Sequence, residues 1–363
     1  MRIGLIVNPL AGIGGPLALK GSDGTVAMQA IERGATPLAL GRVTTALVSL
    51  VGQESRFELL TCADDMGEAA ASAAGIPAQF VYRSERWPST RQDTIRAATA
   101  LQLAGIDLLL FGGGDGTARD LMSAVPTTLP VLGIPAGVKM HSAVFATSPR
   151  SAGAMLVALI NRGINATEMV DIVDRAVEGG APALFGALRT PCAPGLRQAA
   201  KAIGPLEDGH DLAGACAAVA NRLRQTGMAI IGPGSTMLQI KNALAPGGSL
   251  LGVDVFSKGR LLHADADADI LLGVCEGAEL ILGVIGGQGI LVGRGNQQLT
   301  PKILDAIGSR GLTIVASAAK LASLASGKLM VDSGDPRLDE RLSGHVRVQT
   351  AAHRQMIIKL VPA

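Results

Sequence analysis

The sequence has very few aromatic residues and almost no net charge, and both absences exclude classes of protein. Phe, Tyr and Trp together make up 2% of the 363 residues, and the formal net charge is +2. Proteins that bind nucleic acids usually stack bases on exposed aromatic rings or present a strongly basic surface. We therefore expect small-molecule partners and no nucleic acid.

Cysteine is also scarce, and the four that occur form no metal-binding pattern. They lie far apart, without a CxxC pair or a nearby His at metal-ligand spacing: Cys62, Cys192, Cys216 and Cys275. Reduced thiols in a cytosolic protein are the simplest interpretation. The apolar runs are short or interrupted by proline, so we expect no signal peptide, no membrane span and a cytoplasmic location.

Several common catalytic signatures are missing as well. The chain has no GxxxxGK[ST] segment, and Gly12-Ile13-Gly14 does not extend to GxGxxG because position 17 is leucine. No GxSxG or HExxH segment occurs. These absences disfavour P-loop enzymes, dinucleotide-dependent dehydrogenases, serine hydrolases of the GxSxG type and zinc peptidases.

What the chain does contain is enough apolar sequence for two domains. Hydrophobic residues make up 48% and charged residues 17%, which excludes a disordered chain. In the first part, short β-rich runs alternate with Ala-rich stretches of helical length, as is typical of a parallel sheet with helices on both faces. The predicted strands are 3–7, 57–61, 78–82, 107–111 and 130–134, and the predicted helices are 41–51, 65–74 and 90–103.

The pattern changes after a predicted helix over 151–162. Further strands are predicted at 169–173, 184–189, 228–231, 250–256, 279–284, 312–316 and 356–361, with helices at 212–224 and 301–307. We therefore expect an α/β fold with an N-terminal Rossmann-like parallel-sheet domain (1–162) and a second mixed α/β, strand-rich domain (163–363). The last strand could return to the first domain, and the active site is expected in the cleft between the two.

The strongest chemical signal is a glycine string directly after an apolar strand. Leu108–Phe111 precedes Gly112-Gly113-Gly114-Asp115-Gly116-Thr117, and a helix is predicted to follow. Glycines let backbone N–H groups approach a phosphate, and a helix N-terminus adds partial positive charge. The one carboxylate, Asp115, suits proton acceptance from an attacking hydroxyl or a contact to Mg²⁺. A glycine-rich turn capped by Asp is the structural alternative.

Other polar groups lie in segments where a ligand is expected. Lys139 follows the fifth predicted strand, where it suits a donor phosphate, although a solvated lysine is the alternative. Lys20 and Asp23 stand between glycines, and they suit either a phosphate or metal contact or a capped turn. The 294–297 segment carries Arg, Asn and Gln, which suit phosphate or ribose recognition or loop-stabilising hydrogen bonds.

These segments together resemble one superfamily of kinases. Gly-Gly-Asp-Gly-Thr after a strand is similar to the signature of NAD kinases, diacylglycerol kinases and sphingosine kinases, and Asn8-Pro9-Leu10-Ala11-Gly12 resembles their first loop. Strings at 19–24, 231–236, 250–254, 286–298 and 331–335 are similar to the ATP-NAD kinase/acetoin-catabolism protein X family. The resemblance spans nearly the whole chain.

The resemblance implies phosphoryl transfer from ATP (or polyphosphate), with Mg²⁺, to the 2′-hydroxyl of the adenosine ribose of NAD(H). Asp115 matches the aspartate that orients or deprotonates this hydroxyl, and no metal ligand is assigned. The expected donor-binding residues are Asn8, Gly12, Gly112, Gly113, Gly114, Gly116, Thr117, Gly137 and Lys139. The expected acceptor-binding residues are Gly234, Ser235, Thr236, Arg294, Asn296 and Gln297. We also expect a homo-oligomer, with a dimer favoured.

One segment departs from the family pattern. The resemblance leads us to expect Asp-Ala-Asn-Glu near 265–268, where this chain reads Asp-Ala-Asp-Ala. The missing amide and carboxylate keep two alternatives open. One is a kinase of another small hydroxyl-bearing metabolite, and the other is a non-catalytic nucleotide-binding regulator on the same fold.

Overall fold

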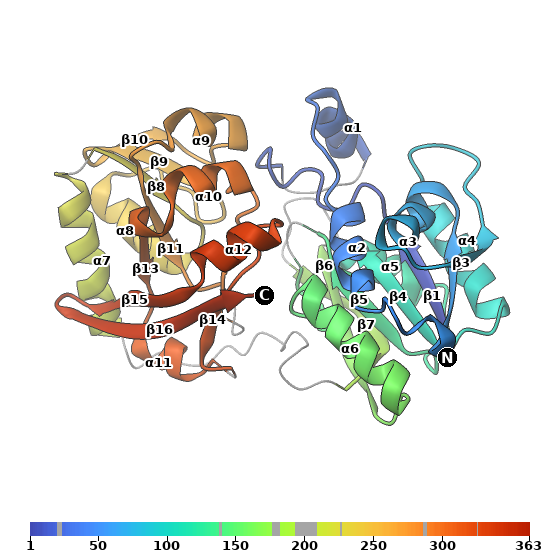
Figure 1. The fold of residues 1–363 in the computed structure, drawn as a ribbon. Helices are drawn as coiled ribbons and strands as arrows, with labels where there is room; N and C mark the ends of the chain where they lie inside the picture. Colours follow the sequence, from blue (N-terminus) through green and yellow to red (C-terminus); the bar gives the residue numbers. More distant parts are fainter. Residues whose placement is uncertain are drawn as a thin grey trace. The chain divides into compact units, whose positions relative to one another are not determined.

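A computed structural model of the chain describes residues 1–19, 24–137, 140–175, 182–192, 209–225, 227–285, 289–324 and 326–363. The chain forms two compact units (Figure 1). The first contains residues 1–13 and 20–200, and the second contains residues 14–19 and 201–363. The predicted boundary at residue 162 falls inside the first unit, because the hairpin that follows it packs on that unit's helix and sheet.

The first unit is built around a five-stranded parallel sheet in the order β3-β2-β1-β4-β5. Its strands are β1 (Arg2–Val7), β2 (Glu58–Cys62), β3 (Ala78–Tyr82), β4 (Leu108–Gly113) and β5 (Val131–Pro135). All residues of β4 and β5 are buried, as expected for parallel strands covered on both faces. The structure confirms the predicted parallel-sheet class, and each predicted strand agrees within two residues.

Helices cover both faces of this sheet. One face packs against α2 (Ala39–Val48), α3 (Glu68–Ala74) and α6 (Pro149–Arg162), and the other against α4 (Arg91–Leu103) and α5 (Asp115–Met122). Successive residues of a strand point to opposite faces, so the buried side chains of β1 and β4 divide between the two layers. A further helix, α1 (Gly24–Glu32), follows the first loop.

Local sequence explains where two of these helices begin. Thr90 and Asp93 form a reciprocal capping box at the start of α4. The Ser148 side chain caps α6, and Pro149 occupies the first helical turn, where its missing N–H costs nothing.

An antiparallel hairpin follows α6. It consists of β6 (Thr167–Arg175) and β7 (Pro182–Pro191), which contain the predicted strands 169–173 and 184–189. Val170, Ile172 and Leu188 are buried in the same core cluster as α4 and α5. The hairpin is therefore part of the first unit's core.

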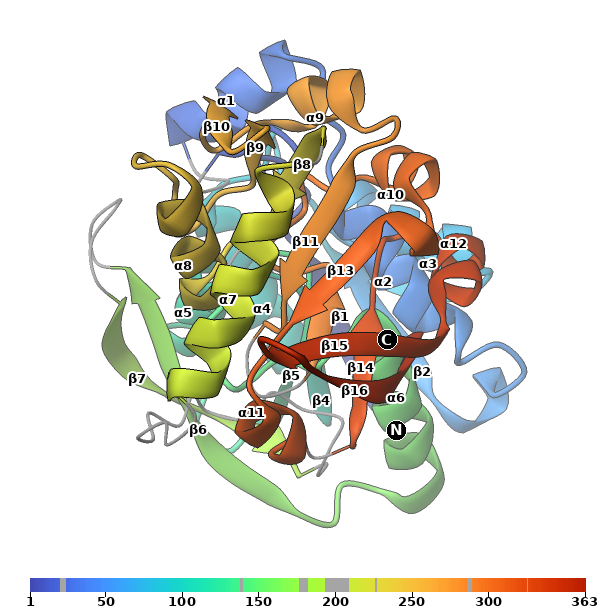
Figure 2. The ribbon, with the colours of Figure 1, turned by 90° about the vertical axis from the view of Figure 1, so that its left-hand side faces the viewer.

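The second unit is built around a mixed nine-stranded sheet in the order β10-β9-β8-β11-β13-β15-β16-β14-β12. The strands are β8 (Met228–Ile231), β9 (Asp254–Ser257), β10 (Arg260–His263), β11 (Glu279–Gly283), β12 (Ile290–Val292), β13 (Leu312–Val315), β14 (Lys328–Val331), β15 (Gly344–Ala351) and β16 (Arg354–Pro362). Figure 2 shows β15 and β16 as a long hairpin, and β16 also pairs with β14. The last strand thus stays in the second sheet, and the unit is strand-rich and mixed as predicted.

Among the described residues, the helices that accompany this sheet are α7 (Gly209–Leu223), α8 (Ser235–Leu244), α9 (Ala268–Val274), α10 (Pro301–Ile307), α11 (Ala318–Ala322) and α12 (Pro336–Leu342). In the part of the chain that the structure describes, no helix is long and apolar enough to cross a membrane.

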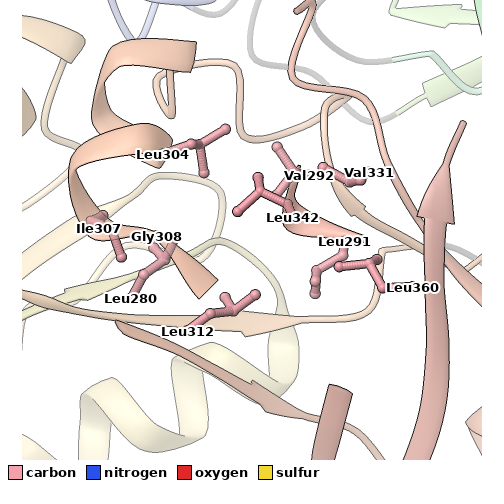
Figure 3. A pocket seen from close by; sticks show the side chains of 10 residues that line it. All are labelled: Leu280, Leu291, Val292, Leu304, Ile307, Gly308, Leu312, Val331, Leu342 and Leu360. Atoms are coloured by element: carbon pink, nitrogen blue, oxygen red, sulfur yellow. The ribbon is translucent and has the colours of Figure 1, made fainter. Parts of the chain in front are cut away.

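The second core contains a small cavity (Figure 3). Its volume is about 10 Å³, room for roughly one water molecule. Nine apolar side chains and Gly308 line it: Leu280, Leu291, Val292, Leu304, Ile307, Leu312, Val331, Leu342 and Leu360. With no polar side chain at its wall, the cavity is a packing gap between α10 and the sheet.

Candidate active site

The glycine string forms a very short connection between a strand and a helix. Strand β4 continues through Gly113 and α5 begins at Asp115, so Gly114 alone separates the two elements. The expected loop is therefore mostly strand end and helix start. Asp115 stands in the first turn of α5, where a carboxylate interacts favourably with the positive end of the helix dipole.

Glycines allow three backbone segments to meet at this strand end. A Cβ on Gly137 would lie 2.8 Å from the Cα of Gly114, and Gly137 N–H donates to the Gly113 carbonyl at 3.1 Å. Gly12 has φ +80°, and a Cβ there would lie 2.3 Å from the Ala136 carbonyl oxygen. No larger residue fits these positions without moving backbone, so the glycines keep the segments after β1, β4 and β5 in contact.

Asn8 ties the first of these segments to α5. Its backbone N–H donates to the Gly112 carbonyl at 2.9 Å, and its side-chain Nδ2 donates to Thr117 Oγ1 at 3.1 Å. Its Oδ1 accepts from the N–H of Leu10 at 3.1 Å. Three of the expected donor-binding residues, Asn8, Gly112 and Thr117, are thus brought together within the first unit.

Asp115 is 5% exposed and is held by two backbone donors. Its Oδ2 accepts from the N–H of His141 at 2.6 Å, and its Oδ1 accepts from the N–H of Ser142 at 3.0 Å. Burial raises the pKa of Asp115 above its usual value, while the hydrogen bonds from Ser142 and His141 favour the charged form. The result is a desolvated carboxylate with a fixed orientation.

His141 and Ser142 each donate a backbone N–H to the carboxylate of Asp115. The side chain of His141 is exposed, and it is the backbone N–H of this residue that binds Asp115. Ser142 is fully buried, and sequence reasoning did not single it out. Lys139, Lys20 and Asp23 lie outside the described residues.

In the second unit, the expected acceptor residues 234–236 form the start of α8. Gly234 has φ +113°, which favours glycine, and its N–H donates to the Leu250 carbonyl at 2.8 Å. Ser235 is exposed and Thr236 is half-buried in the first helical turn. The Gly-Pro-Gly string thus ends in a helix N-terminus.

In the 294–297 segment, the Asn296 side chain forms hydrogen bonds with the backbone of its own loop. Asn296 is 1% exposed; its Oδ1 accepts from Gly293 N–H at 2.8 Å and its Nδ2 donates to the Leu291 carbonyl at 2.9 Å. These hydrogen bonds stabilise the loop, which is the alternative to ligand recognition for Asn296. Gln297 lies against Gly15, where a Cβ would fall 1.9 Å from its Oε1, and Arg294 is half-buried.

A buried ion pair in the second unit was not found from the sequence. Lys241 and Asp254 are both fully buried, with Nζ and Oδ2 3.1 Å apart. Lys241 also donates to the carbonyls of Ser249 and Gly252, each at 2.9 Å. Burial lowers the pKa of Lys241, and the charge of Asp254 opposes this effect. The available signal was a lysine four residues after Met237, on the inward face of α8.

The aspartates at positions 265, 267 and 269 have different local conformations. Asp265 has φ +50°, Asp267 caps α9 by accepting from Ile270 N–H at 3.1 Å, and Asp269 lies in the helix. Among the residues that the structure describes, no group of three or more His, Cys, Asp or Glu side chains is placed to hold a metal ion.

In the first unit, adjacent parallel strands thus end in glycine-lined segments around one buried carboxylate. Residues 3–164 match the family model of the ATP-NAD kinase N-terminal domain, and residues 227–360 match that of the ATP-NAD kinase C-terminal domain. A search of curated proteins and a search of solved structures found no match. The chain belongs to the ATP-NAD kinase family, which confirms the resemblance and makes it a phosphotransferase with a hydroxyl acceptor.

Proposed function

We propose that this kinase transfers the γ-phosphoryl group of ATP to the 2′-hydroxyl of the adenosine ribose of NAD(H), with Asp115 at the acceptor hydroxyl. The observation that carries the proposal is the buried Asp115 carboxylate, fixed by two backbone N–H groups at a glycine-lined strand end. The two family matches support NAD as the substrate.

Asp115 suits an orienting role. A carboxylate has about four lone-pair sites, and the backbone of residues 141 and 142 uses two of those on Asp115. The remaining capacity can accept a hydrogen bond from an alcohol. Phosphoryl transfer has a loose transition state, so positioning and charge neutralisation contribute more than proton abstraction.

The donor phosphates would be bound by the glycine-lined segments. We assign this role to Asn8, Gly12, Gly112, Gly113, Gly114, Gly116, Thr117, Gly137 and Lys139. The helix dipole of α5 and the close backbone approach at Gly114 and Gly137 support this assignment.

A divalent cation fits this set of groups in the way Mg²⁺ usually binds nucleotides. Mg²⁺ is commonly held by substrate phosphates and water with only one or two carboxylates, so the lack of three clustered protein ligands among the described residues is compatible with it. The phosphates of the donor would hold it, and no protein ligand is assigned to it. When bound, the cation would neutralise charge on the phosphates.

For the acceptor we propose contacts from Gly234, Ser235 and Thr236 and from Arg294 and Gln297. Asn296 would act indirectly, because its side-chain donor and acceptor already bind the backbone of its own loop. A kinase of another small hydroxyl compound is the second candidate. Its support is the 265–268 segment, where Asp267 caps a helix and Ala268 replaces the expected carboxylate.

The test is an assay of the purified chain with Mg²⁺ and either ATP or polyphosphate. NAD, NADH and a panel of small polyols would be offered as acceptors, with Asp115→Asn as the control for contaminating kinases. Formation of NADP or NADPH that depends on Asp115 supports the proposal. Phosphorylation of a polyol alone supports the second candidate, and the absence of NADP and NADPH with every donor overturns the NAD assignment.

A further inference from the structure

Ser142 connects Asp115 to the β6–β7 hairpin. Its backbone N–H donates to Asp115 Oδ1 at 3.0 Å. Its side-chain hydroxyl donates to the Val173 carbonyl at 3.1 Å and accepts from the Val173 N–H at 3.0 Å. One fully buried residue thus binds the carboxylate on one side and both backbone groups of a β6 residue on the other.

A second connection joins the same hairpin to the helix that carries Asp115. Arg119 lies one turn further along α5, and its Nη1 contacts Asp174 Oδ2 at 2.9 Å. The Arg119 guanidinium also lies over the Phe185 ring of β7, 5.3 Å from its centroid. Val173 of β6 therefore binds Ser142, which donates to Asp115. Asp174 of β6 binds Arg119 of α5, the helix that carries Asp115.

Tight packing makes the hairpin a firm support. Val170, Ile172 and Leu188 are buried in the first unit's core, and Gly186 of β7 lies so close to α5 that a Cβ there would be 2.7 Å from Met122 Sδ. A displacement of β6 would move Ser142 and α5 together. Catalytic groups must be held to within about 0.5 Å of their productive geometry, so such a support matters for the rate.

We propose that Ser142 is a positioning residue for the catalytic carboxylate, anchored by the β6–β7 hairpin. The inference rests on the proposed function, because it assigns a supporting partner to Asp115. It predicts that loss of the Ser142 hydroxyl slows the transfer step and leaves donor binding intact.

The experiment compares Ser142→Ala with wild type in steady-state kinetics across pH. We expect kcat to fall between about tenfold and hundredfold, the scale of a displaced reacting group, with the KM for ATP within about twofold. The acid limb of kcat/KM should move to higher pH, because N–H donors that are held less firmly stabilise the charged carboxylate less. His141 is the charged neighbour that favours the ionised form of Asp115, and it is kept in this variant.

Ser148→Ala is the matched control. Ser148 is also fully buried in the first unit, and its Oγ accepts from Ser151 N–H at 3.1 Å to cap α6. This variant should lose stability without changing kcat or the pH profile. If Ser142→Ala does not fold, Arg119→Met loosens the hairpin from α5 instead, and a smaller loss of kcat with the same direction of pH shift is expected.

The Asp115→Asn variant distinguishes failure of the Ser142 proposal from failure of the proposed function. If this variant is inactive while Ser142→Ala keeps the wild-type kcat and pH profile, the positioning role is overturned and the proposed function stands. If Asp115→Asn retains a near-normal rate, the proposed function fails, and the role of Ser142 fails with it.

Discussion

The two units use buried polar side chains in different ways. In the second unit, Lys241 has three acceptors for its three N–H groups, and Asn296 binds the backbone of its own loop through both its oxygen and its nitrogen. In the first unit, Asp115 accepts two hydrogen bonds and keeps capacity for more. Burial is common to all three side chains, and the unused hydrogen-bonding capacity of Asp115 is the difference on which its proposed role rests.

The largest effect is expected from breaking the Lys241–Asp254 ion pair, in which every N–H group of Lys241 has an acceptor. Lys241→Met leaves Asp254 charged and buried without its partner, which should lower the free energy of unfolding by about 3–5 kcal/mol. Arg341→Met is the control, because the Arg341–Asp305 pair is 61% exposed on both sides and should cost less than about 1 kcal/mol. Denaturant titration of both variants measures the contrast, and equal losses would contradict it.

Asp115 should show the opposite behaviour, with a large effect on rate. Asp115→Asn should reduce kcat by about a hundredfold or more, while calorimetry shows ATP binding preserved. Because burial raises the pKa of Asp115, the wild-type kcat/KM should increase with pH through a midpoint above 3.8, as the carboxylate loses its proton. A variant with a normal rate would remove Asp115 from the mechanism.

Asn296 tests whether a structural side chain also shapes acceptor binding. Asn296→Ala strands the buried Gly293 N–H and the Leu291 carbonyl, so we expect a loss of about 2 kcal/mol in stability. The KM for NAD should rise more than the KM for ATP, because the proposed acceptor loop is loosened. Asn221→Ala, at an exposed position of α7, is the control, and an unchanged stability in Asn296→Ala would refute the structural role.

The smallest effect is expected at Gly137, whose backbone contacts Gly114 in the segments proposed to bind the donor phosphates. Gly137→Ala places a methyl group 2.8 Å from the Cα of Gly114, and the resulting shift should weaken ATP binding about tenfold, or about 1.4 kcal/mol. Gly273→Ala, where a Cβ meets nothing within 4 Å, should leave binding unchanged. Unchanged calorimetric affinity in Gly137→Ala would argue against the phosphate assignment of these segments.

Sequence patterns predicted the first unit better than the second for a physical reason. The strands β1, β4 and β5 are apolar runs that end at Asn, Gly or Pro, so each is visible in its own residues. In the second unit, β10, β12 and β14 have three or four residues and were not predicted, and the eight-residue β15 was not predicted either. Helix α8, which begins directly after Gly234, was not among the predicted helices.

The candidate site also has one part that the sequence could predict and another that it could not. The string around Asp115 is local, so its strand-end position was predictable from the residues alone. The partners of Asp115 lie 26 and 27 residues away, and the hydroxyl of Ser142 finds Val173 a further 31 residues on. A sequence read by itself also could not indicate that the backbone N–H of His141 binds Asp115.

Residues 14–19 are synthesised long before the residues that they contact. Residues 14–19 belong to the second unit, where the Pro16 carbonyl accepts from Ala268 N–H and Gly15 packs against Gln297. A ribosome adding roughly 5–20 residues per second makes these partners on the order of tens of seconds after the loop itself. Residues 14–19 therefore emerge early but can make these contacts only after the second unit has been synthesised. A fragment starting at residue 201 would lack this segment altogether.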